Sequence, residues 1–196
     1  WATRTAGGTL SVVVGGDLHL GGGQYVADGD LSLSAAMISL GQQANGQSTA
    51  NRVGIYGALG SGIVSVQSQD WIKLGNVDLY SGHALSLSTP RPLLVEQEAS
   101  VQSGTDMALS FGPATGIFHQ GQIETRSYLN NAGTLFAGGR TTLSSSAGLP
   151  ISVDNSGILG GVSALVLGSV AQPADILSQA TGQVLGGDFS LVLRDL

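Results

Sequence analysis

The chain has 196 residues, of which 31 are glycine, 7 are basic and 13 are acidic, so that its net charge is −6. This balance excludes nucleic acid as a partner, because a basic stripe is needed to displace counterions from phosphates. A hydrophobic share of 42% excludes general disorder, and no apolar run approaches the roughly 18 residues of a membrane span. The composition predicts a soluble, glycine-rich, mostly β protein.

The ends of the chain and its lack of cysteine say little about the compartment. Without cysteine there is neither a disulfide framework nor a thiolate metal ligand or nucleophile, and this suits the cytosol and export equally. The chain opens with Trp-Ala-Thr-Arg, without a leader or an initiator methionine. We therefore expect a processed product or an excised fragment, with residues 1–196 forming a single segment.

Short stretches of alternating apolar residues predict strands along the whole chain. In chain order they include Leu18/Leu20, Leu31/Leu33, Val64/Val66, Ile72/Leu74, Leu85/Leu87, Leu165/Leu167 and Leu191/Leu193. Alternation over four to six residues between Gly or Asn residues is typical of a half-buried strand. Only residues 35–40 and 173–180 are candidates for a turn or two of helix.

One phrase recurs in the C-terminal third of the chain. It has the form Asn-x-Gly-x-Leu followed by Gly-Gly-x-x-x-Leu, and variants of it occupy residues 131–143, 155–165 and 180–191. Corresponding glycines recur at a regular interval from Gly82 to Gly104 and from Gly139 to Gly161, but the interval from Gly104 to Gly139 is much longer. The period is therefore in the low twenties, with slips.

Short strands with one apolar face, separated by tight corners at this period, must bury that face against neighbouring units. A parallel β-helix does so, because each rung pairs with the rungs on either side of it. We predict an all-β fold, a right-handed parallel β-helix (solenoid) of about nine coils with short loop excursions. A β-sandwich or roll is the alternative, although its strands are usually longer and its sequence does not repeat.

The repeated phrase, with its Ser/Thr-rich trailing strand at 141–146, resembles the haemagglutinin repeats of filamentous-haemagglutinin-type exoproteins, which include contact-dependent growth-inhibition effectors. The likeness is best over 129–193 and, before residue 115, is limited to strand texture. It implies export by an outer-membrane two-partner-secretion transporter of a Gram-negative bacterium, and a secreted or cell-surface location. The Asn-Pro-Asn motifs of the secretion domain and the Val-Glu-Asn-Asn signature near the toxin are missing, which implies the middle of the shaft.

Two pairs of acidic residues lie close together in the sequence. Asp28 and Asp30 have no further acid near them, whereas Ca²⁺ needs six or more oxygen ligands, so we interpret them as turn caps. Glu96 and Glu98 are interpreted as a solvated face. Standard nucleophile, phosphate and zinc motifs are absent, so we predict no enzyme activity and no catalytic, cofactor-binding or metal-binding residue.

Histidines and aromatic residues are further candidates for a site. His19, His83 and His119 are widely separated in the sequence, which places them on different coils and argues against a shared metal. Six aromatic residues are candidates for a platform on which a sugar stacks, but their scatter along the chain favours ordinary packing. They are Trp1, Trp71, Tyr25, Tyr56, Tyr80 and Tyr128.

Three stretches break the strand pattern. Residues 41–52 are polar, residues 88–98 contain Pro90 and Pro92, and residues 171–178 contain Pro173 and are predicted as a short helical insert. Excursions from a solenoid are where binding surfaces are usually built. The simpler interpretation is that they are loops which the rod tolerates.

We expect a structural shaft segment that holds adhesive or toxic modules away from the cell. One alternative is an adhesive module that uses loops 41–52 and 88–98 to recognise a host or bacterial cell-surface ligand. Another is a carbohydrate-active enzyme on the same fold, which would lose activity when an acid such as Asp106 or Asp154 is replaced. Exposed strand edges at both ends also predict end-to-end self-association of the isolated fragment.

Overall fold

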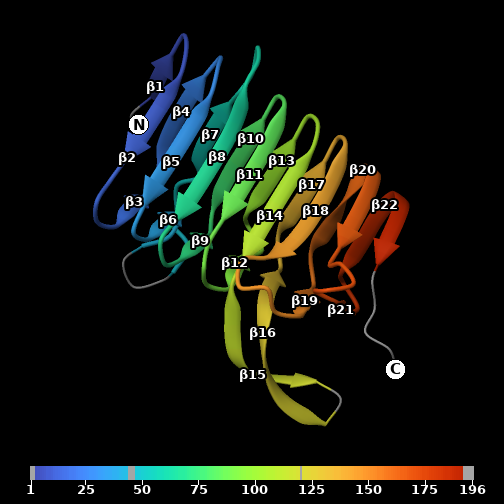
Figure 1. Cartoon of the computed structure of the whole chain (residues 1–196). Helices are drawn as coiled ribbons and strands as arrows, with labels where there is room; N and C mark the ends of the chain where they lie inside the picture. The colour runs from blue at the N-terminus through green and yellow to red at the C-terminus, as the bar shows by residue number, and fades with distance from the viewer. Residues whose placement is uncertain (1–2, 44–46, 120, 192–196) are drawn as a thin grey trace.

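A computed structural model of the chain describes residues 3–43, 47–119 and 121–191. The regular elements within these ranges are all β-strands, and they stack side by side from β1 at one end to β22 at the other (Figure 1). None of the described residues belongs to a helix long and apolar enough to cross a membrane. The all-β prediction is confirmed, and the parallel stacking makes the molecule a solenoid.

Successive strands are distributed over three faces. The first face holds β1 (Thr3–Ala6), β4 (Gly23–Ala27), β7 (Val53–Gly57), β10 (Val77–Ser81), β13 (Ser100–Ser103) and β17 (Thr134–Ala137). The second holds β2 (Leu10–Val13), β5 (Leu31–Ala35), β8 (Ile63–Ser68), β11 (Ala84–Ser88), β14 (Met107–Phe111) and β18 (Arg140–Ser145). Two long strands, β20 (Ile158–Leu167) and β22 (Gln183–Leu191), run across both faces.

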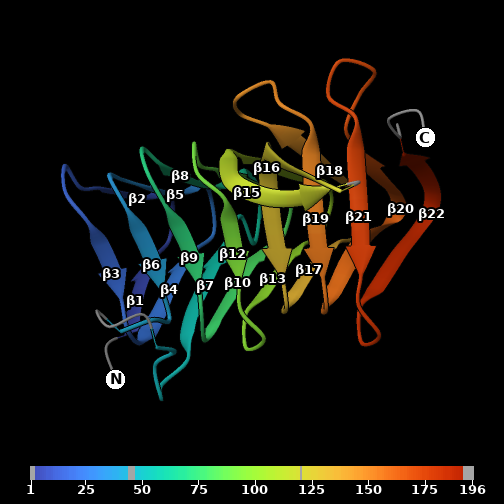
Figure 2. The same cartoon turned by 90° about the horizontal axis from the view of Figure 1, so that it is seen from below.

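The third face is the one that Figure 2 turns toward the viewer. It holds β3 (Leu18–Leu20), β6 (Ile38–Leu40), β9 (Ile72–Leu74), β12 (Leu93–Val95), β16 (Gln122–Asn131), β19 (Ile151–Asn155) and β21 (Ala174–Ser178). Neighbours on all three faces pair in parallel, and β15 (Pro113–His119) is antiparallel to β16. The described residues thus make six turns of three strands and a seventh in which β20 covers two faces and β21 the third, and β22 begins an eighth, where about nine coils were expected.

The core consists of apolar rows that run along the solenoid. In one row Leu31, Val64, Leu85 and Met107 stand in register on consecutive rungs, each at most 2% exposed. Side chains alternate across each strand, so the next residue along β5, β8 and β11 is a partly exposed serine. Burial of such rows stabilises the fold by about 25 cal/mol per Å² of apolar surface. This stabilisation is spread over the length of the rod.

Glycines at the corner between the first and second faces allow the backbones of successive coils to approach closely. A Cβ on Gly104 would lie 2.1 Å from the carbonyl oxygen of Gly82, and one on Gly138 would lie 2.3 Å from that of Gly104. Real side chains essentially never come this close, so the corner requires glycine on successive rungs. This requirement explains part of the unusual glycine content.

Asparagines occupy the corner between the third and first faces. Asn131 and Asn155 are register partners, both are fully buried, and the Asn131 amide donates to the Asn155 side-chain oxygen at 2.8 Å. The Asn155 amide in turn donates to the carbonyl oxygen of Gln183 at 3.1 Å. The asparagine of the repeated phrase therefore satisfies backbone groups that the turn would leave unpaired.

Two stretches that were expected to interrupt the solenoid instead form regular turns of it and contain strands, so those predictions are wrong. Residues 88–98 contain β12, whose Leu93 pairs with Leu129 and whose Leu94 pairs with Lys73. Residues 171–178 contain β21, so they form no helical insert, and residues 35–40 likewise contain a strand, β6. Proline stands just before β12 and before β21, where the ladder requires no N–H from it.

Two true excursions remain, one of which was expected. On the first face, the step from Gly23 to its register partner Val53 is longer than the usual coil, because it includes the 41–52 loop. The step from Ser100 to Thr134 is longer still, because it includes the β15–β16 hairpin. Figure 1 shows this hairpin extending away from the stacked coils. The long interval from Gly104 to Gly139 marked it in the sequence, but its strand character was not recognised.

Candidate functional site

Aspartates at the corner between the first and second faces cap the next coil. The Asp30 carboxylate accepts a hydrogen bond from the backbone N–H of Ile63 at 2.9 Å, and Asp106 accepts one from that of Arg140 at 2.8 Å. In both places a glycine comes just before the donor, and its missing side chain leaves room for the carboxylate. Asp30 was expected to cap its own turn, and the structure shows that its carboxylate, like that of Asp106, reaches across to the following coil.

The other candidate acids also lie in structural settings. Asp28 is exposed, and its backbone carbonyl accepts from Gly60 at 2.9 Å. Asp154 accepts from the Gln179 amide at 2.8 Å, and the charge of this carboxylate adds to burial, the main cause, in raising the pKa of the Tyr128 phenol. Within the described ranges, no three His, Cys, Asp or Glu side chains gather into a potential metal site.

The three histidines lie on different coils, as the spacing predicted. His19 is an exposed residue of β3, and the ring of His83 lies with its Nε2 3.2 Å from the Gly60 carbonyl oxygen. His119 belongs to β15, where only its backbone is described. The described positions bring no two histidines together.

Glu96 anchors the polar excursion at 41–52. Its carboxylate accepts from the side-chain amide of Gln42 and from the hydroxyl of Ser48 at 2.6 Å. The interpretation of Glu96 as part of a solvated face is therefore wrong. The loop that follows β6 contacts this residue, which lies two turns further along the solenoid, and the Glu96 side chain is only partly exposed. Glu98, by contrast, is exposed.

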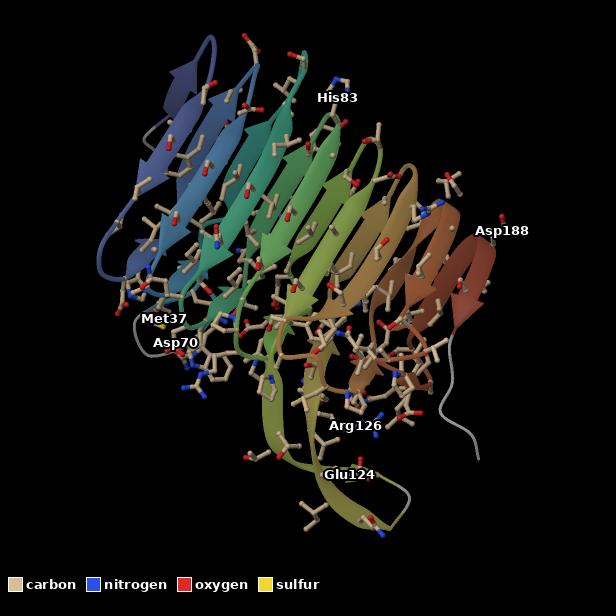
Figure 3. All side chains as sticks on the ribbon, viewed as in Figure 1. Met37, Asp70, His83, Glu124, Arg126 and Asp188 are labelled. Carbon is tan, nitrogen blue, oxygen red and sulfur yellow. The ribbon has the colours of Figure 1, made fainter. Side chains whose placement is uncertain are left out.

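A buried arginine anchors the β15–β16 hairpin. The Arg126 side chain is 0% exposed, and its guanidinium pairs with Glu124 at 3.0 Å and with Asp175 of β21. It also donates to the Ile151 carbonyl oxygen of β19 at 3.2 Å. Figure 3 shows Arg126 near the base of the hairpin, next to the coils, and Glu124 farther out along it. Sequence reasoning missed this cluster, because Asp175 lies on a strand that is distant in the chain from Arg126 and Glu124.

The structure brings two of the six candidate aromatic residues together. Tyr56 of β7 and Tyr80 of β10 are register partners and both project outward from the first face. Trp71 instead lies beside Lys73, whose ammonium is 5.6 Å from the ring centre, Tyr25 packs against the core, and Tyr128 belongs to the third face. Trp1 lies outside the described residues.

A shallow cleft of about 220 Å³ opens beside the two tyrosines. It is lined by Tyr56, Asp78, Leu79, Tyr80, Ser100 and Gln102, which come from three adjacent strands. At one end of the cleft the Asp78 carboxylate accepts from Arg52 at 2.6 Å, and this hydrogen bond is the main reason that the pKa of Arg52 is raised. The cleft thus combines aromatic rings with amide, hydroxyl and carboxylate groups.

A second hollow, of about 280 Å³, lies over β8, β11, β14 and β18 on the second face. Its lining includes small and apolar side chains such as Ala84 and Ala108, together with the rim residues Asp106 and Arg140 of the corner between the first and second faces. Because the Asp106 carboxylate already caps the backbone of Arg140, the rim is part of the corner structure described above.

The site that the geometry singles out is therefore the tyrosine cleft. From the sequence, its two tyrosines were expected to lie apart from each other, as part of a scattered set of aromatic residues. Register was the missing information, because Tyr56 and Tyr80 are separated by the same step along the chain as the paired strands β7 and β10. No family model, curated protein or solved structure matches this chain.

Proposed function

We propose that the chain is a structural segment of the shaft of a secreted or cell-surface filamentous exoprotein, wound as a right-handed parallel β-helix. The observation that carries this proposal is the solenoid itself, in which each coil pairs with the coils on either side of it. Each rung adds about 4.8 Å to the rod, and a continuous apolar interior resists bending. Right-handed crossover is the general rule for parallel strands.

The haemagglutinin-repeat resemblance supports placing this shaft in a two-partner-secretion exoprotein of a Gram-negative bacterium. The residues behind the resemblance have structural roles suited to a repeat, since Asn131 and Asn155 are joined by a hydrogen bond and only glycine fits at position 138, close to the carbonyl oxygen of residue 104 on the preceding coil. Such a chain would pass an outer-membrane transporter unfolded and fold outside. Its mechanical task would be to hold an adhesive or toxic module away from the cell.

A catalytic role is disfavoured by what the candidate acids do. An acid that acts in glycoside cleavage must face the substrate and a second carboxyl group at about 5–9.5 Å. Asp106 instead accepts a hydrogen bond from the backbone N–H of Arg140, and Asp154 accepts one from the Gln179 amide. These observations support a non-catalytic function.

An adhesive module is the second candidate function, and one observation favours it. The β15–β16 hairpin projects from the solenoid with Ile123 exposed on it, and a buried arginine fixes its base. The 41–52 loop is a further excursion from the coils, and its Ser48 is held by Glu96. Residues 88–98 drop out of this candidate, because β12 makes them part of the coil.

Cell binding distinguishes the two functions. The purified, labelled chain would be incubated at micromolar concentration with epithelial cells and with Gram-negative bacteria, beside one variant with 41–52 shortened and one with 114–125 replaced by a short Gly-Ser turn. A shaft segment gives no saturable binding with any of the three proteins. Saturable binding that is lost in one variant would overturn the passive shaft and locate an adhesive site in the shortened segment.

A further inference from the structure

An aromatic and polar row runs along the outside of the first face. Tyr56, Tyr80, Gln102 and Phe136 are partners on the consecutive strands β7, β10, β13 and β17. All four side chains are at least partly exposed. Rungs are about 4.8 Å apart, close to the length of one pyranose ring, so the row spans several sugar residues.

Gly54 sets the position of the first ring. A Cβ on Gly54 would lie 2.6 Å from Cε2 of Tyr56 and 3.2 Å from Cζ, which means that the tyrosine ring lies back over the glycine backbone. One side of the ring is therefore supported by the sheet. Tyr80, on the next rung, is 37% exposed and lines the cleft together with it.

Polar groups stand at fixed positions around the rings. The Gln102 amide donates to the Ser100 hydroxyl at 2.9 Å, which orients this amide beside the cleft while its second N–H and its carbonyl oxygen remain for further bonds. Asp78 lines the cleft as well and is held by Arg52. The amide, hydroxyl and carboxylate groups thus stand around the two aromatic rings, close enough for a single sugar ring to contact both.

We propose that this cleft binds a neutral saccharide, with a pyranose ring stacked on Tyr56 and Tyr80 and its hydroxyls bonded to Ser100, Gln102 and Asp78. The C–H face of a pyranose is slightly positive and is attracted to the negative face of an aromatic ring. A volume of about 220 Å³ is below the roughly 300–1,000 Å³ of pockets that enclose drug-sized ligands, and it suits one ring in an open groove. Further residues of an oligosaccharide lie along the row toward Phe136.

Charge favours a neutral sugar over an acidic one. The guanidinium of Arg52 is already engaged by Asp78, so it offers an incoming carboxylate no unpaired positive charge. The whole chain carries a net charge of −6, which repels polyanions. The site is independent of the shaft function, because a shaft without a saccharide site would still be a shaft.

Titration of the full chain, labelled with ¹⁵N, tests the proposal. The probes are cellotetraose and chitotetraose as neutral saccharides and tetragalacturonic acid as the charged comparison. We expect at least one neutral probe to shift the Gln102 side-chain amide signals saturably, with a dissociation constant below about 5 mM. Absence of saturation by both neutral probes up to about 20 mM, or tighter binding of the acidic probe, overturns the proposal.

Variants locate the site. Tyr80→Ala is expected to weaken binding about 10-fold, because a stacked ring is lost, whereas Tyr80→Phe keeps affinity within about 2-fold. Tyr128→Ala, on the third face, is the matched control and leaves affinity unchanged. If Tyr80→Ala fails to fold, Gln102→Ala, at an exposed position, replaces it and is expected to weaken binding about 5-fold. Unchanged binding in the folded cleft variant would place the saccharide elsewhere and overturn the assignment.

Discussion

Arg126 and Asp175 join two strands that are separated by a third. The guanidinium of Arg126, on β16, is fully buried and donates to the carboxylate of Asp175 on β21, while β19 lies between them. A second carboxylate, that of Glu124, approaches the same guanidinium from the hairpin. This arrangement fixes the hairpin to the coils and stabilises the third face across two rungs.

Replacing Arg126 tests whether the ion pairs or the packing of this side chain matter more. We expect Arg126→Ala to lower the free energy of unfolding by about 3 kcal/mol, because it removes both the buried volume and the donors. Arg126→Met, which keeps the volume, is expected to cost about half as much, because Glu124 and Asp175 are 26% and 27% exposed and regain water. Urea unfolding followed by circular dichroism measures both. Equal losses would mean that the ion pairs, and not the volume, dominate.

The asparagine ladder is a second point of stability. Asn155→Ala removes the acceptor for Asn131 and the donor for the Gln183 carbonyl oxygen, leaving buried groups unpaired. We expect a loss of about 2 kcal/mol in the free energy of unfolding. Asn130→Ala, one residue from the ladder and exposed, serves as the control and stays within about 0.5 kcal/mol of the unaltered chain. A similar loss in both variants would contradict a specific ladder.

Alkaline pH should weaken the third face through Tyr128. Burial raises the pKa of this phenol, and Asp154 raises it further, so the folded state holds the proton more tightly than the unfolded state does. The resulting stabilisation is fully present below the unfolded pKa of about 10 and is lost as the pH rises through the folded pKa. Tyr128→Phe lacks this dependence. Above about pH 10 the unfolding free energy of the unaltered protein should therefore fall relative to that of the variant. A difference that is constant with pH would contradict the assignment.

Much of the fold could be predicted from the sequence, because the alternation of apolar residues and the spacing of Gly-Gly pairs follow directly from strands and corners. The 88–98 and 171–178 segments were misjudged for a local reason. A proline cannot donate a hydrogen bond to the neighbouring strand, but the residues that follow it can still form a strand. Leu93, Val95 and Ala174, which follow prolines, are buried within strands. The hairpin is marked in the sequence by the long interval from Gly104 to Gly139, although apolar and polar residues do not alternate regularly along its strands.

The candidate site was harder to predict, because it depends on register. Tyr56 and Tyr80 become neighbours for only one length of the coil between them, and the length of each coil varies with its loops. In the same way Glu96 meets the 41–52 loop only because the strands between them stack in a particular order. Sequence patterns predict which side of a strand faces inward, whereas contacts between coils require the length of every intervening turn.

End-to-end association of the isolated chain is a further prediction. On the last coil described, Phe189 follows the inward row of Leu165 but is 55% exposed, because no further described rung covers it. Open strand edges pair readily with other chains. Sedimentation velocity should therefore show oligomers whose share grows with concentration, and Phe189→Lys should reduce it. A monomer at all concentrations would count against open ends.

The spacing of labels along one row tests the stacked solenoid most directly. Ser11, Thr142 and Ser190 belong to a single outward row of register partners, with Thr142 five rungs and Ser190 seven rungs from Ser11. Because the chain has no cysteine, cysteines introduced at two of these positions carry the only spin labels. Pulsed electron paramagnetic resonance should give narrow distance distributions near about 24 Å for Ser11–Thr142 and about 34 Å for Ser11–Ser190. Distances that fail to increase with rung number, as in a sandwich whose strands fold back, would contradict the stacked rod and with it the proposed shaft.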